Sequence, residues 1–251
     1  MESLLISKLV LPFISTMGAA LTIMYINSVN RRVKESKQKI YAATYILDSS
    51  MRMLSSEFIV LINTIKPHIE ASYRIIKGNK ELLDIMLLTD EFDILTEAGP
   101  DFSHIPNEFS LQLGYDNLEL VQVYDTLLYL FRSDSARSSL NHFVKENIKS
   151  MDGFLQKEES DRIDILNTYI DYLDRLEHEA KRLIFMIAYN VLPRLENYIS
   201  SNKFIFYSTG HAKKTIQMTK DILRDNAAYV PKHDFMETVR NGGIQSELKK
   251  P

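Results

Sequence analysis

The chain has 251 residues, of which 45% are hydrophobic and 10% aromatic, so it is long and apolar enough to bury a core. It contains 8 glycines and 7 prolines, too few for the tight turns of an all-β sandwich or barrel, and no cysteine, which excludes disulfides and thiolate chemistry. The formal net charge of -3 is unevenly distributed, and the single dense basic cluster does not form the broad basic face of a nucleic-acid-binding protein, so no nucleic-acid partner is expected.

An uncharged N-terminal stretch predicts a membrane anchor within residues 1–30. No charged residue occurs over residues 9–30, and residues 9–26 are mainly Leu, Ile, Met, Val and Ala. At about 1.5 Å per residue this segment just crosses a hydrocarbon core of roughly 30 Å. A basic flank follows at Arg31, Arg32, Lys34, Lys37 and Lys39. By the positive-inside rule we expect a single-pass protein with its N-terminus outside and its C-terminal domain cytoplasmic, in the inner membrane if the source is bacterial.

Two other interpretations of this stretch compete with the anchor. A cleavable signal peptide carries its positive charge ahead of the apolar run, whereas only Lys8 precedes this one. A buried core helix is the second alternative, but such helices rarely lie at a chain terminus with so one-sided a basic flank. The anchor is therefore the leading hypothesis, with the lipid bilayer as partner and the basic flank binding anionic headgroups.

The residues after the flank predict a long helix with a coiled-coil-like seam. One apolar set recurs at intervals of seven: Val33, Ile40, Leu47, Leu54 and Leu61. A second set lies four residues further on: Lys37, Thr44, Met51, Phe58 and Ile65. The helix is expected to run to about Ile65, and Pro67 to kink or end it. Two arrangements fit the seam: a helix packed within its own chain, and a dimeric coiled coil.

Residues 81–131 combine an excess of acid with two shorter predicted helices. Gly78 and Asn79 predict a turn before a helix over about 80–97, residues 98–114 are the longest expected loop, and a capping box opens a helix over about 116–131. The segment holds eleven acidic residues and no Lys or Arg. It is either a solvated face that stays away from anionic lipid or a docking surface for a basic protein partner. The candidate docking residues are Asp90, Glu91 and Asp93.

The second half of the chain predicts three further helices and a tail. A helix through about Ile148 is followed by a break at Gly153, a second long amphipathic helix over 157–199 and a last helix over about 203–228. Residues 231–251 lack periodicity and predict a flexible tail. The expected fold is thus mainly α: a single N-terminal transmembrane helix, then an elongated antiparallel helical bundle over 31–230 with coiled-coil-like long helices.

No motif predicts catalysis. The phosphate-binding patterns GxxxxGK[ST] and GxGxxG are absent, as is the GxSxG elbow of serine hydrolases. The spacing of Asp171, Asp174, Glu177 and His178 places them on one helical stripe, which fits a ligand set but fits a solvated face better because basic residues interrupt it. The His233-Asp234 pair has no partner histidine at a suitable spacing for a metal site. No catalytic residue, metal site or cofactor is therefore expected.

Three functions are consistent with the sequence. The leading one is a membrane-tethered helical protein-interaction module, a scaffold or adaptor without catalytic activity, which binds a protein partner or itself. The second is a membrane-perturbing effector whose transmembrane helix oligomerises when the cytoplasmic domain is triggered, for which Ser15, Gly18, Ala19 and Ala20 permit close helix approach. The third is a helical enzyme with a site of dispersed Asp, Glu and His residues.

Overall fold

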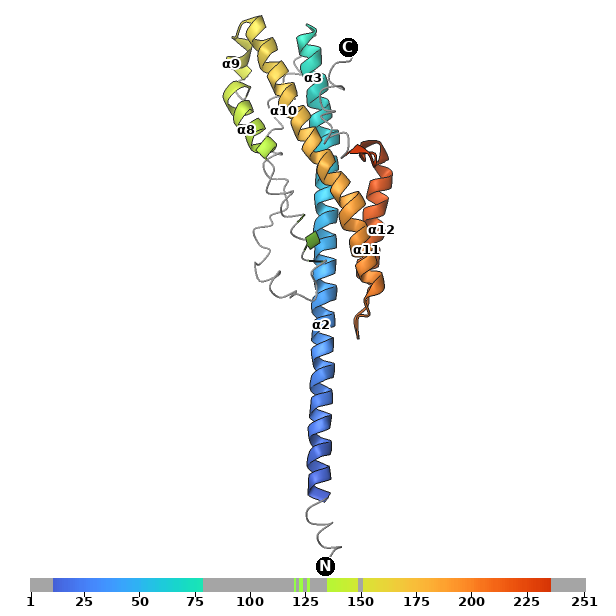
Figure 1. The fold of residues 1–251 in the computed structure, drawn as a ribbon. Coiled ribbons are helices and arrows are strands. Elements are labelled where there is room, and N and C mark those ends of the chain that lie inside the picture. The colour runs from blue at the N-terminus through green and yellow to red at the C-terminus, as the bar shows by residue number, and fades with distance from the viewer. Residues whose placement is uncertain are drawn as a thin grey trace, which may run out of the picture.

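A computed structural model describes residues 11–78, 120, 122–123, 126, 135–148 and 151–235. Every regular element in these residues is helical, and no strand occurs among them. The helices form an elongated bundle from which one end of the first helix projects (Figure 1). The mainly α helical bundle predicted from the sequence is confirmed.

One continuous helical rod forms the axis of the bundle. Helix α2 (Leu11–Ile59) passes directly into a π-helical segment, η2 (Val60–Ile65), and then into α3 (Lys66–Ile76). At about 1.5 Å per residue the rod is about 100 Å long. The rod continues past Ile65, where the sequence predicted a kink or an end, because Pro67 lies in the first turn of α3, where its missing N–H costs little, and a wider π-helical turn precedes its ring. The rod ends at Gly78, whose φ of 85° is a helix-terminating conformation that suits glycine.

The predicted heptad seam faces the core of the chain's own bundle. The first set is buried from Ile40 onward, at Ile40, Leu47, Leu54 and Leu61, whereas the second set is half-buried at Thr44 and Met51 and fully buried only at Phe58 and Ile65. Lys37 is exposed, so the seam begins only at Ile40. A further row of α2 and its continuation, distinct from both apolar sets, is also buried at intervals of seven. Most of its members are small: Ser36, Ala43, Ser50, Glu57, Thr64 and Ala71. So wide a buried face indicates a helix packed among several neighbours of its own chain.

The second long helix runs antiparallel to the rod and packs along it (Figure 1). It consists of α10 (Glu159–Met186), the π-helical segment η5 (Ile187–Val191) and α11 (Leu192–Ser201), which confirms the prediction for residues 157–199. Glu159 and Asp161 in its first turn favour the helix start through the helix dipole. A π-helical segment again precedes a proline, Pro193, which lies in the first turn of the following helix.

Shorter helices cover the two rods. Helix α8 (Ser135–Asn147) packs on α10, close to the predicted bounds. Gly153 lies inside the short helix α9 (Met151–Leu155) rather than between elements. Helix α12 (Gly210–Asp225) packs on α2 and α11 and is followed by a 3₁₀ turn, η6 (Ala227–Tyr229). The predicted last helix therefore starts seven residues later than expected, because residues 203–209 are not helical and contain a turn at residues 204–207.

Several predictions concern segments that are only partly described. Within the helix predicted over 116–131, the four described residues Leu120, Gln122, Val123 and Thr126 are helical. The predicted helix over 80–97 and loop over 98–114 lie outside the described residues. Of the predicted tail, residues 231–235 pack on α10 and η5, where Phe235 lies 5.4 Å from the His178 ring and 5.9 Å from the Phe185 ring. Residues 236–251 lie outside the described part.

Candidate functional site

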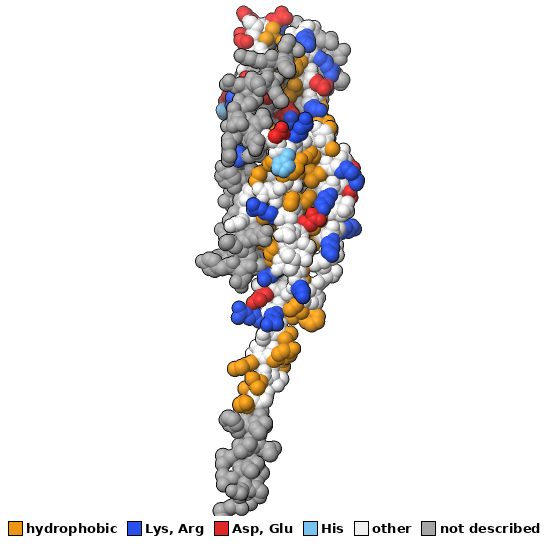
Figure 2. All heavy atoms as spheres, turned by 45° about the vertical axis from the view of Figure 1, so that its right-hand side comes forward, with side chains coloured by type: hydrophobic (Ala, Val, Ile, Leu, Met, Phe, Trp, Pro, Cys, Tyr) orange, Lys and Arg blue, Asp and Glu red, His pale blue; other side chains and the backbone are white. Residues whose placement is uncertain are grey.

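The N-terminal part of α2 leaves the bundle as a single helix with exposed apolar side chains. Residues 16–26, here called the apolar arm, include six large apolar side chains that are each at least half exposed: Met17, Leu21, Ile23, Met24, Tyr25 and Ile26. At about 100° per residue, these side chains point to all sides of the helix rather than to one face. Figure 2 shows apolar side chains on the projecting helix just below the body of the molecule.

The predicted membrane anchor at residues 9–26 contains this arm. Leu9 and Val10 lie outside the described residues. Among the helices that the structure describes, none is both long enough and apolar enough to cross a membrane.

A basic neck, residues 31–39, lies where α2 enters the bundle. The predicted flanking residues Arg31, Arg32, Lys34 and Lys37 are exposed, and Lys39 is half-buried. Glu35 is the only acid in the neck, and its Oε1 accepts a hydrogen bond from Arg31 Nε at 2.8 Å. This pair is exposed and hence weak, so the neck keeps its positive potential. Figure 2 shows basic side chains gathered at this level of the molecule.

A turn distant in sequence lies beside the neck. The backbone N–H of Ile205 donates to Ser36 Oγ at 3.3 Å, and the N–H of Tyr207 donates to the Phe204 carbonyl at 3.3 Å. The Phe204 ring packs on Tyr198 of α11, with centroids 6.5 Å apart. At the tip, Phe206 is 82% exposed and has a φ of 63°. The sequence predicted a helix through these residues, although the short apolar run of residues 204–207 interrupts the helical spacing.

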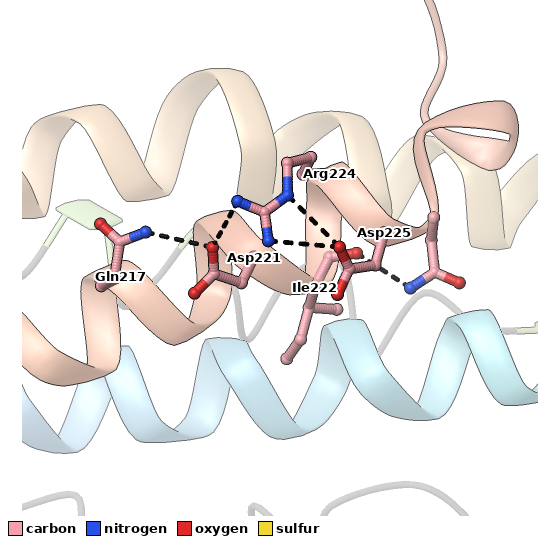
Figure 3. A network of polar contacts seen from close by, with 6 residues as sticks. Gln217, Asp221, Ile222, Arg224 and Asp225 are labelled. Carbon is pink, nitrogen blue, oxygen red and sulfur yellow. Dashed lines mark hydrogen bonds and ion pairs between the residues drawn. The ribbon is translucent and has the colours of Figure 1, made fainter.

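The predicted docking residues Asp90, Glu91 and Asp93 lie outside the described residues. The described acids include a network on α12, where Arg224 Nη1 lies 3.0 Å from Asp221 Oδ1 and Arg224 Nε lies 3.3 Å from Asp225 Oδ1 (Figure 3). Gln217 Nε2 also donates to Asp221 Oδ1, at 3.1 Å. Because Arg224 is 71% exposed and Asp225 67%, this network is a solvated surface feature of low energy.

The Asp171–His178 stripe on α10 is a partly buried, ion-paired face. Burial raises the pKa of Asp174, and the charges of Glu177 and Asp171 raise it further, while Lys181 opposes them. Glu177 Oε1 is 2.7 Å from Lys181 Nζ. Burial lowers the pKa of His178, and Arg182 and Lys181 act in the same direction. No group of three or more acidic or histidine residues that could hold a metal ion occurs in the part of the chain that the structure describes.

Two buried polar pairs were not predicted. Arg137 Nη2 of α8 donates to Glu57 Oε1 of α2 at 2.5 Å, with the two side chains 14% and 9% exposed. Tyr169 Oη of α10 lies 2.9 Å from His68 Nδ1 of α3. Burial lowers the pKa of His68 to about 4 and raises the pKa of Tyr169 well above its usual value, so both are uncharged at neutral pH. Glu57 lies seven residues from both Ser50 and Thr64, in the row of mostly small residues that is buried along the rod. This spacing of seven was the sequence signal for its burial.

The arm, the neck and the turn thus occupy one end of the molecule and are the features that a partner would meet there. Comparison of the chain with models of known protein families, with curated proteins and with solved structures found no match.

Proposed function

We propose that the protein is a membrane-tethered helical protein-interaction module, a scaffold or adaptor without catalytic activity. The carrying observation is the apolar arm, whose large side chains are exposed on all sides of one helix. Soluble monomers rarely expose a contiguous apolar surface of this kind, and a helix that is apolar all round is typically enclosed by protein or lipid. The basic neck next to the arm favours lipid, because cationic side chains beside an apolar segment bind anionic headgroups.

The bundle beyond the neck serves as the interaction body in this proposal. The rod from Ile40 to Ile76 is about 55 Å long at 1.5 Å per residue, and it is packed against the second long helix over much of this length. A body of this shape presents surfaces far from the membrane in a fixed direction. The acidic segment of residues 81–131 is the proposed docking surface for a basic protein partner, on the basis of its sequence charge.

Membrane fractionation of the full chain tests the tether. The intact protein should sediment with membranes, while a chain that begins at Asn30 should be soluble. Resistance to carbonate extraction would favour a spanning segment, and release by carbonate would favour attachment at the surface. Recovery of the intact chain in the soluble fraction would overturn the proposal. A cytoplasm-specific reporter fused after Pro251 should be active if the bundle lies in the cytoplasm.

Two triple variants test whether membrane attachment depends on the arm or on nonspecific association through any exposed apolar residue. Replacing Leu21, Ile23 and Met24 with Gln removes apolar surface from the arm and should release the protein from membranes. The control replaces three exposed apolar residues of the bundle, Tyr41, Ile59 and Tyr73, with Gln and should leave membrane attachment unchanged. Equal loss in both variants would indicate that attachment does not depend on the arm.

A second candidate function is a membrane-perturbing effector whose arm self-associates. One observation favours it: a Cβ added at Gly18 meets no atom within 4 Å, and the neighbouring Ala19 and Ala20 are also exposed. Small exposed residues let two helices approach closely. Gly18→Leu should then abolish cross-linked oligomers in membranes and any toxicity on overexpression, whereas a simple tether should tolerate it.

A further inference from the structure

We propose that the turn of residues 204–207 is a second lipid contact, which places Ile205 and Phe206 in the interfacial zone of an anionic bilayer and seats the bundle on it. This inference rests on the proposed membrane tether and extends it to a segment about 170 residues away in sequence. The turn and the projecting end of α2 point toward the same end of the molecule (Figure 1).

Phe206 is unfavourably placed for a folded protein in water. It is 82% exposed, the highest value among the exposed large apolar side chains of the described residues, and its neighbour Ile205 is 38% exposed. Its φ of 63° lies in the left-handed region, which in the third position of a turn favours Gly or Asn. A bulky aromatic residue held in a strained and exposed position is an outlier that points to function.

The turn is held firmly against the neck rather than loosely attached. Ile205 N–H donates to Ser36, which lies in the middle of the basic neck and is itself buried. The Phe204 ring faces inward on Tyr198, so only the tip of the turn is presented outward. A preorganised apolar tip loses little conformational freedom when it enters an interface.

The charge around the turn identifies the partner as anionic lipid. The chain over residues 202–214 contains Lys203, Lys213 and Lys214, all exposed, and no acidic residue, while Asp48 of α2 lies 3.5 Å from His211 beside the last two lysines. Lys203, which directly precedes the turn, adds to the cations of the neck that the turn contacts through Ser36, so the arm and the turn are each bordered by positive charge. An aromatic ring with adjacent Lys and Arg residues suits the headgroup level of an anionic bilayer.

The absence of tryptophan from the chain allows a direct test, because each introduced tryptophan is the only one. Three variants of the full chain are reconstituted in vesicles of phosphatidylcholine and phosphatidylserine in equal amounts, with and without bromine on the acyl chains. Phe206→Trp reports the turn, Tyr25→Trp reports the arm, and Tyr73→Trp on α3, 48% exposed, is the control. We expect brominated lipid to quench the first two and not the third.

The outcomes separate the two proposals. Quenching of Tyr25→Trp alone overturns the turn contact and leaves the tether intact, whereas quenching of neither variant overturns both. Quenching of Tyr73→Trp would show nonspecific association and also overturn the contact. A concentration-dependent blue shift of Phe206→Trp in detergent without added vesicles would assign the turn to a second copy of the chain instead of lipid. Quenching of Phe206→Trp that is equally strong in vesicles of phosphatidylcholine alone would overturn the proposed specificity for anionic lipid.

One further variant tests whether the ring itself makes the contact. Phe206→Gly keeps the backbone conformation, which glycine adopts without strain, and removes the aromatic group. The folded bundle should be at least as stable as the wild type. A chain that begins at Asn30 is expected to bind anionic vesicles too weakly to sediment with cell membranes, and Phe206→Gly should abolish that weak vesicle binding. Unchanged vesicle binding by the shortened Phe206→Gly protein would contradict the proposal, and its thermal unfolding shows whether the shortened chain is folded.

Discussion

His68 is a histidine whose chemistry is set by the core around it. Burial lowers its pKa from 6.5 to about 4, so between these values the unfolded chain binds a proton that the folded chain excludes. Stability is therefore fully present above about pH 6.5 and is lost as the pH falls toward 4, by about 3 kcal/mol for a shift of this size. His68→Phe should flatten this dependence in denaturant unfolding measured at about pH 7 and about pH 4.5.

Tyr169→Phe is the matched control for that measurement. It removes the hydroxyl 2.9 Å from His68 Nδ1 but leaves the histidine buried, so the acid sensitivity should remain. Asp174, whose pKa is raised, contributes in the opposite direction and equally in both variants, so it cancels from the comparison. Equal pH dependence of the wild type and His68→Phe would contradict the assignment.

The Glu57–Arg137 pair gives a second prediction for single residues. Removing one partner takes this ion pair away from the other charge, which remains in a site where it is only 9% exposed (Glu57) or 14% exposed (Arg137). Arg137→Met should therefore cost about 3–5 kcal/mol of unfolding free energy, and the double change Glu57→Leu with Arg137→Met should recover much of that loss. The control is Lys220→Met, which breaks an exposed pair with Glu196 and should cost less than about 1 kcal/mol. A similar loss in all three variants would show that the buried charge is not the cause.

At the level of helices, α2 offers a matched test of its buried face. Leu54 is fully buried and Ile59 is 55% exposed on the same helix. Leu54→Ala should cost roughly 2–5 kcal/mol, which lowers the melting temperature by about 2–4 °C per kcal/mol in a protein of this size. Ile59→Ala should change the melting temperature little. Comparable losses for the two would mean that the buried face has been assigned wrongly.

The long helices were predictable because the apolar positions that indicate them are close together in sequence and recur at a fixed spacing. Each apolar position from Ile40 to Ile65 independently supports the same period, so the face that becomes buried could be identified from spacing alone. Helix ends were less predictable. Pro67 was expected to kink or end its helix, but both Pro67 and Pro193 follow a π-helical segment, and no pattern in the sequence signals that adjustment. Likewise Gly153 is tolerated inside a helix, although glycine is a weak helix former.

At the scale of the whole molecule, the candidate site was predictable only where it is contiguous in sequence. The apolar arm and the basic neck are consecutive segments of one helix, so composition alone identified them. The turn of residues 204–207 reaches Ser36 only because α10 and α11 run antiparallel to the rod and return the chain to the neck. That proximity depends on tertiary packing, which the residues around Phe206 do not encode locally.

The acidic segment is the part of the molecule where charge should govern binding to a protein partner. Eleven acids without a base over residues 81–131 create a negative potential that speeds encounter with a basic surface and makes it sensitive to salt. Replacing Asp90, Glu91 and Asp93 with Asn or Gln should therefore weaken capture of the partner from detergent-solubilised membranes. Stability and membrane attachment should remain nearly unchanged, because these changes leave the apolar arm and the described core intact.

A control with the same change in net charge separates docking from general electrostatics. Glu196, Asp221 and Asp225 are acids on the surface of α11 and α12, and replacing them with Gln or Asn removes three negative charges that do not belong to the proposed docking segment. If residues 81–131 dock the partner, only the first triple variant should weaken capture, and added salt should reproduce its effect on the wild type. Capture that resists both the substitutions and salt would leave these acids with the alternative role of keeping the domain away from anionic headgroups, because like charges repel.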